Sequence, residues 1–149
     1  MDALAEDLRT QFLVGAPKDP ARDAATAELV RDPIVMAGSS DGGAHVLSFT
    51  GADYSTRLLA EWVPGTLSLE QAVHKMTGLP AKKLGLRDRG AVRVGAKADL
   101  VVFNGKTVGD RATFEQPHQY PVGIEYVLVN GRLVIKGGEH TGSMPGRVL

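Results

Sequence analysis

A continuous apolar run at residues 34–37 restricts how this chain can fold more than any other feature. The run has no polar residues alternating with the apolar ones, which is typical of a strand covered on both faces in a parallel sheet. Before it, Asp19 and Pro20 have the chemistry of a helix start, and residues 21–31 are rich in alanine and other good helix formers. We therefore predict a helix followed by a buried strand, which is one step of an α/β fold.

The length of the chain leaves room for few such steps. A complete barrel of eight α/β units normally needs roughly 250 residues, whereas this chain has 149. One helix and one strand cannot close a barrel, and they leave unpaired strand edges and a large apolar face. We therefore expect a chain that depends on a partner for part of its fold.

Helical patterns follow over the next forty or so residues, and one of them has clear end signals. Ser68 and Gln71 form a capping box, and apolar residues then recur at the i, i+3, i+4 and i+7 positions of one helix face. Gly78 stands where a C-terminal stop is expected. Weaker helical patterns cover residues 52–63 and 80–84, so the middle of the chain is predicted to be helical.

β-Favouring patterns begin near Gly90. Val92 and Val94 alternate with polar residues, and residues 100–103 form a run of β-favouring side chains. The dipeptide at residues 130–131, Asn-Gly, separates two further apolar runs and readily supplies the two positive φ angles of a type I′ turn. The last third of the chain is therefore predicted to contain a β-hairpin.

Composition and charge exclude several classes of function. Lysine plus arginine and aspartate plus glutamate both total 17, so the net charge is zero and we expect neither nucleic acid nor an anionic membrane as a partner. No apolar stretch is long enough to cross a bilayer, and the acidic start at residues 1–7 is unlike a signal peptide, so a cytoplasmic location is expected. Because cysteine is absent, any metal must be held by histidine, carboxylate or modified lysine.

Asp41 is the main candidate for chemistry. It lies in a glycine-rich polar segment just after the predicted strand, where α/β barrels place catalytic groups. A carboxylate there can bind a divalent metal and accept a proton from water that the metal activates. An equally weighted alternative is an Asx turn in which the Asp41 side chain caps Gly42 and Gly43.

Ser40 and His45 are weaker candidates in the same segment. Residues 38–42 fit the pattern G-x-S-x-G, so Ser40 could be the nucleophile of a serine hydrolase, although the sequence after it is a poor helix start. The four histidines form no H-x-H or H-E-x-x-H zinc signature. Among the four histidines, His45 is the best candidate for a functional residue because it lies only four residues after Asp41.

An ordered series of short motifs resembles the carboxy-terminal part of the amidohydrolase superfamily. The resemblance begins at about residue 27 and runs to the end of the chain. Its general motifs are residues 39–45, 69–73, 77–81, 88–90 and 95–103. A further set is similar to the D-aminoacylase branch, the N-acyl-D-amino-acid deacylases, and comprises residues 112–114, 117–121, 123–127, 129–131 and 141–149.

The resemblance implies a fold of the α/β plus β class. Residues 1–89 would contain the last α/β step or steps of a TIM-like, metal-dependent hydrolase barrel, and residues 90–149 part of a small β-sandwich. In that superfamily both ends of the chain build the sandwich. The missing amino-terminal barrel portion, or a complementary subunit, is therefore the expected macromolecular partner.

The resemblance also implies an activity and a cofactor. The complete enzyme would hydrolyse the amide bond of an N-acyl amino acid with one or two zinc ions. Asp41 would be the general base and a metal contact, and Ser40 and His45 would lie on the substrate side. The family's H-x-H motif, bridging ligand and two further histidines are not supplied by this sequence, so we expect the chain alone to be inactive and to bind zinc weakly.

Two alternatives remain open at this point. The chain could be a non-catalytic structural module from a truncated or split gene, which acts only by associating with another subunit. A serine hydrolase that uses Ser40 is less favoured, and it would be indifferent to metal chelators.

Overall fold

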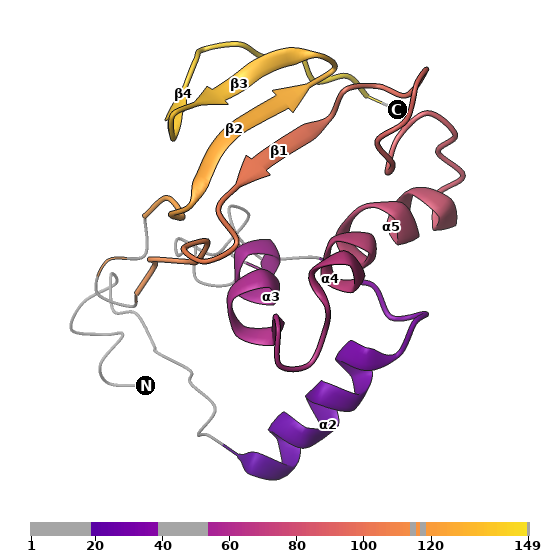
Figure 1. Cartoon of the computed structure of the whole chain (residues 1–149), viewed down its shortest axis with the longest axis vertical. Coiled ribbons are helices and arrows are strands. Elements are labelled where there is room, and N and C mark those ends of the chain that lie inside the picture. Colours follow the sequence, from indigo (N-terminus) through magenta and orange to yellow (C-terminus); the bar gives the residue numbers. More distant parts are fainter. Residues whose placement is uncertain (1–18, 39–53, 114–115, 117–118, 149) are drawn as a thin grey trace, which may run out of the picture.

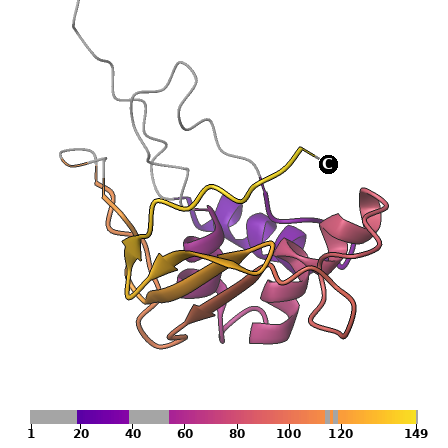
Figure 2. The same cartoon turned by 90° about the horizontal axis from the view of Figure 1, so that it is seen from above.

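A computed structural model describes residues 19–38, 54–113, 116 and 119–148. In Figure 1 three short helices, α3 to α5, lie between helix α2 and a small antiparallel sheet. Figure 2, turned by 90°, shows the helices grouped on one side of that sheet. The described residues thus combine a helical layer with one sheet, in the order that the sequence patterns predict.

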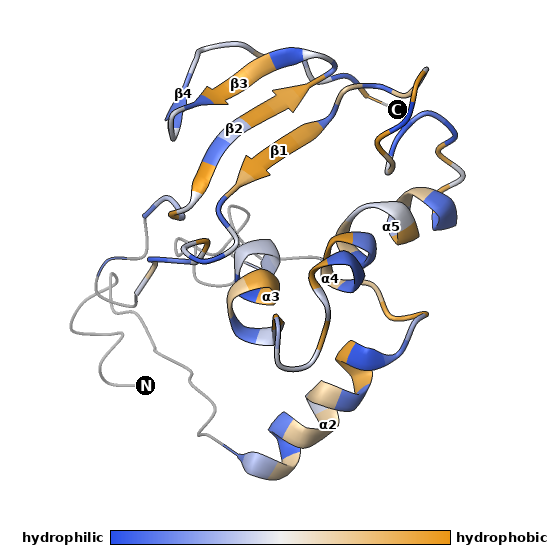
Figure 3. Ribbon diagram, in the orientation of Figure 1, coloured by the Kyte–Doolittle hydropathy of each residue, from blue (hydrophilic) through white to orange (hydrophobic). Residues whose placement is uncertain are grey.

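Helix α2, Pro20–Arg31, begins where the capping signal predicts. The side chain of Asp19 accepts a hydrogen bond of 2.9 Å from the Ala21 N–H, and Pro20 occupies the first helical turn. Polar and apolar residues are interspersed along the helix as seen in Figure 3, and none of its residues is buried. Val30, near the C-terminal end of α2, is partly buried and packs against the core cluster.

The buried strand predicted at residues 34–37 is absent, and this prediction is wrong for the isolated chain. The segment is a turn followed by irregular structure, with Ile34 68% exposed and Met36 46% exposed. A parallel strand forms only when neighbouring strands accept and donate its backbone hydrogen bonds. The described part of the chain places no strand beside this segment.

Helices α3, α4 and α5 span Tyr54–Trp62, Leu69–Met76 and Gly78–Lys83. The capping box of α4 is confirmed, because Ser68 Oγ accepts from the Gln71 N–H at 3.2 Å and Gln71 Oε1 accepts from the Ser68 N–H at 2.8 Å. Helix α4 ends at Met76 with Thr77 as its C-cap, just before Gly78 as predicted, and Gly78 then begins α5. A β-carbon at Gly78 would lie 2.7 Å from His74 Nδ1, so a larger residue there would displace the exposed His74 side chain.

The sheet contains β1 Leu100–Phe103, β2 Ile124–Val129, β3 Arg132–Lys136 and β4 Glu139–His140, all antiparallel neighbours in that order. The predicted hairpin is confirmed, since Asn130 and Gly131 have φ angles of 49° and 78° between β2 and β3. Val92 and Val94, which suggested an earlier strand, lie in an irregular segment and are exposed.

The apolar core is small and lies between the helices and the near edge of the sheet. Its buried members come from α3, α4, the loop between them and the segment between β1 and β2: Leu58, Leu59, Leu67, Ala72 and Val108. Phe103 and Ile124 pack against this cluster from the paired ends of β1 and β2. Among the described residues, seven apolar side chains are buried and sixteen large apolar side chains are exposed, so much of the apolar surface lacks a covering partner.

Candidate functional site

The three predicted site residues, Ser40, Asp41 and His45, lie outside the described residues. The structure does describe the segment that leads into them, residues 32–38, which we call the lead-in segment. It also describes helix α4, whose Lys75 side chain contacts this segment. The described surroundings of the predicted site are therefore the lead-in segment and its contacts.

A compact turn at Asp32 redirects the chain between α2 and the lead-in segment. The Asp32 N–H donates to the carbonyl oxygens of Glu28 at 3.1 Å and Leu29 at 3.2 Å, which closes the helix. Asp32 Oδ1 accepts from the Ile34 N–H at 2.9 Å, and the Asp32 carbonyl accepts from the Val35 N–H at 3.2 Å. Asp32 thus ends α2 and fixes the direction in which the next residues leave.

Lys75, on α4, is a buried cation beneath this turn. The residue is only 6% exposed, and its Nζ donates hydrogen bonds to the carbonyl oxygens of Asp32 and of Val35, the latter at 2.8 Å. In Figure 1 the segment after α2 runs close to α4, which carries Lys75. Sequence reasoning missed this residue, although a signal existed: Lys75 stands three positions after the fully buried Ala72, on the same helix face.

The lead-in segment has one face turned to the core and one exposed face. Val35 and Ala37 are half-buried, and Ala37 packs against the core cluster. Ile34 and Met36, at the alternate positions, are exposed. Alternation with a period of two is the geometry of an extended strand, so the segment already presents a strand-like apolar face to the outside.

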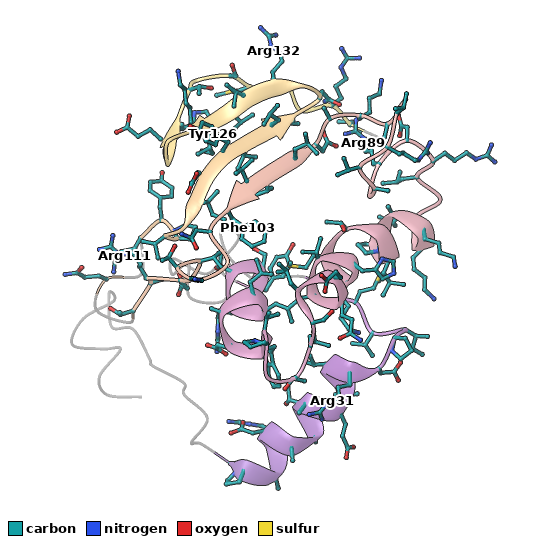
Figure 4. The ribbon with its side chains drawn as sticks, viewed as in Figure 1. Arg31, Arg89, Phe103, Arg111, Tyr126 and Arg132 are labelled. Atoms are coloured by element: carbon teal, nitrogen blue, oxygen red, sulfur yellow. The ribbon has the colours of Figure 1, made fainter. Side chains whose placement is uncertain are left out.

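A second polar cluster joins the loop after α5 to the sheet. Arg89, labelled in Figure 4, donates to an Asp99 carboxylate oxygen and, at 2.7 Å, to Asn130 Oδ1. The Asn130 N–H donates to Asp99 Oδ1 at 2.7 Å. That backbone hydrogen bond, followed by the contact with Arg89, lowers the pKa of Asp99 below its ordinary value, against the opposing effect of partial burial. The cluster links the loop after α5 to the residue before β1 and to the turn between β2 and β3.

The described residues do not form a metal centre. No group of three or more histidine, cysteine, aspartate or glutamate side chains is gathered among residues 19–38, 54–113, 116 and 119–148. His74 is exposed on α4, and the Nδ1 atom of His140 accepts a hydrogen bond from Gly142 N–H at 3.0 Å. A metal site in the complete enzyme would therefore need ligands from beyond the described residues. Within the described part of the chain, no helix is both long and apolar enough to span a bilayer.

Comparison with protein families decides what kind of chain this is. Residues 4–135 match the amidohydrolase family. The chain belongs to the amidohydrolase family. The motif series that resembled this superfamily is thereby confirmed.

Comparison with known proteins narrows the family to its deacylases of D-amino-acid derivatives. N-acyl-D-glutamate deacylase of Alcaligenes xylosoxydans xylosoxydans is 50% identical over 96 residues, which is 63% of this chain and 20% of that protein. A solved D-aminoacylase mutant in complex with CuCl2 aligns with a TM-score of 0.63 and 47% identity over 65% of this chain and 21% of that one. N-acyl-D-glutamate deacylase from Bordetella bronchiseptica, complexed with zinc and a phosphonate inhibitor, gives a TM-score of 0.53 and 48% identity over 55% of this chain and 18% of that one. The chain thus spans about a fifth of the length of the relatives it matches.

Proposed function

We propose that this chain forms the carboxy-terminal part of a metal-dependent amidohydrolase that cleaves the amide bond of an N-acyl-D-amino acid. The observation that carries the proposal is the 50% identity to N-acyl-D-glutamate deacylase over 96 residues, combined with coverage of only 20% of that protein. Identity at this level over a contiguous stretch supports a shared reaction. We also propose that the chain alone is inactive, and the low coverage of the relative supports this.

Asp41 carries the proton in the proposed reaction. Its carboxylate takes a proton from the attacking water and passes it to the leaving nitrogen, which is general acid–base catalysis by one group. Zinc, when bound, supplies Lewis-acid activation of the amide carbonyl and of water. Asp41 is the metal ligand that this chain contributes in the proposal, and Ser40 and His45 contact the substrate.

The remaining ligands and the remaining barrel strands come from a partner polypeptide in this proposal. That polypeptide pairs with the backbone of the lead-in segment and covers its exposed face, which carries Ile34 and Met36. Backbone pairing converts residues 34–37 into the strand that their composition favours and places Asp41 beyond its carboxyl end. In this arrangement residues 1–89 complete the barrel, and residues 90–149 contribute the four-stranded sheet to a small β-sandwich.

A chimera tests the proposal directly. This chain replaces the matching fifth of the Alcaligenes N-acyl-D-glutamate deacylase, so that the relative supplies the rest of the barrel. We expect zinc-dependent hydrolysis of N-acetyl-D-glutamate by the chimera and none by the 149-residue chain alone. Asp41→Asn in the chimera should lower kcat by about 100- to 10,000-fold, the usual contribution of a positioned general base, while zinc content and folding are retained.

Two control variants separate this function from the alternatives. Ser40→Ala should leave more than a tenth of the activity, whereas complete loss together with fluorophosphonate labelling of Ser40 would indicate a serine hydrolase. Glu70→Gln, an exposed change on α4, should leave the rate unchanged. A folded, zinc-loaded chimera without deacylase activity would contradict the proposal and favour a purely structural module, as would full activity in Asp41→Asn.

A further inference from the structure

Lys75 is a buried ammonium whose described partners are two main-chain carbonyl oxygens, those of Asp32 and Val35. Removing an ammonium from water is costly, and a methionine of similar length would fill the same space without that cost. A buried lysine is therefore best explained by what its directed N–H donors hold in place. What they hold is the start of the lead-in segment.

The two carbonyls define both the position and the direction of the lead-in segment. Asp32 closes α2, and Val35 is the first residue of the apolar run with a half-buried side chain. One ammonium that bonds both carbonyls ties these points to a single atom on α4. Val35 precedes Asp41, the proposed base, by only six residues in the sequence.

We propose that Lys75 is a positioning residue, which sets the place of Asp41 in the reaction by clamping the lead-in segment to α4. The proposal rests on the proposed function, because it concerns the geometry of that same site. Reacting groups must be held to well within 1 Å, and a displacement of that size from a remote change can lower the rate about 100-fold. Lys75 itself touches no substrate in this proposal.

The clamp is tested first in the 149-residue chain without reference to activity. Hydrogen–deuterium exchange is followed for the backbone amides of residues 33–38 in Lys75→Met and in Lys82→Met, an exposed lysine on α5. We expect faster exchange of this segment in Lys75→Met only, with the amides of α3 and of the sheet unchanged. Equal exchange in both variants would overturn the proposal.

The effect on the reaction is then measured in the chimera. Lys75→Met should lower kcat by about 100-fold with little change in KM and with zinc content retained. Lys75→Arg, which keeps a cation and several N–H donors, should recover at least a tenth of the native rate. Leu79→Ala removes a buried side chain of α5 outside the core cluster, so it should lower the unfolding midpoint without lowering kcat per folded molecule.

The two arms distinguish the possible failures. If exchange rises in Lys75→Met but kcat per folded, zinc-loaded molecule is unchanged, Lys75 is only structural and the proposal is wrong. If Leu79→Ala lowers kcat as much as Lys75→Met does, the loss reflects general destabilisation and the proposal is again wrong. If the chimera with native Lys75 is inactive, the proposed function fails and takes the catalytic role of Lys75 with it, while the exchange arm still measures the clamp.

Discussion

Two apolar runs of four residues in this chain have opposite outcomes. Residues 100–103 form β1, which pairs along its whole length with β2. Residues 34–37 have comparable apolar composition but form no strand, and their alternate side chains stay exposed. The difference lies in the partner, because β2 is supplied by this chain and no described strand lies beside residues 34–37. Strand propensity becomes structure only where backbone hydrogen bonds can be completed.

The support of β1 depends on close backbone approach, and a single β-carbon should break it. Gly123 has a φ angle of 78°, and a β-carbon there would lie 2.6 Å from the backbone of buried Val108. Its carbonyl also accepts the Asn104 N–H at 2.8 Å, just after β1. We expect Gly123→Ala to cost about 3 kcal/mol or more in the free energy of unfolding, measured by urea denaturation, because the left-handed backbone and the overlap with Val108 add.

Gly131→Ala is the matched control for that change. Gly131 has the same φ of 78°, but no atom lies within 4 Å of the added β-carbon. This variant should therefore cost only about 1–2 kcal/mol, which is the backbone strain alone. Equal losses in the two variants would mean that the packing of Val108 against residue 123 does not support β1.

A polar substitution at Ile34 should have little effect on the free energy of unfolding of the chain alone, but it should lower that free energy when the missing partner is present. In the 149-residue chain Ile34 is 68% exposed, so Ile34→Ser should alter stability by less than about 0.5 kcal/mol. In the chimera the side chain is covered, and the same change should cost about 2 kcal/mol. Chemical denaturation of both proteins measures the difference, and an equally small effect in the two would argue against pairing at this face.

The smallest effect should come from the carboxylate that joins the sheet to the loop after α5. The lowered native pKa of Asp99 means that its stabilisation is complete above the unfolded pKa of about 3.9 and is lost as the pH falls through the native value. Because the side chain is 33% exposed, screening limits the effect of Asp99→Asn to about 1 kcal/mol at neutral pH. Unfolding curves of the two proteins should converge in acid, and a constant gap would contradict the role of the charge.

Local features of the fold were predictable from the sequence because their causes lie within a few residues. The Ser68–Gln71 capping box and the Asn130–Gly131 turn each satisfy or shape backbone groups at short range, and both form as predicted. The end of α4 just before Gly78 also follows the prediction, while α5 begins at Gly78, two residues before the predicted start at residue 80.

Contacts between distant segments were not predictable in the same way. Lys75 is 43 residues from Asp32, and Arg89 is 41 from Asn130, so no local pattern reports either contact. For the candidate site, the sequence predicted Ser40, Asp41 and His45, but it did not indicate the contact of Lys75 with the lead-in segment. The roles of Ser40, Asp41 and His45 stay predictions because these residues lie outside those described.

Hydrogen–deuterium exchange of residues 34–37 and 100–103, in the chain alone and in the chimera, tests the central claim most directly. We predict that amides of residues 34–37 exchange much more slowly in the chimera than in the chain alone, while those of β1 are equally protected in both. Rapid exchange of residues 34–37 in a folded, zinc-loaded chimera would contradict the claim that this run is a strand whose partner lies on another part of the enzyme.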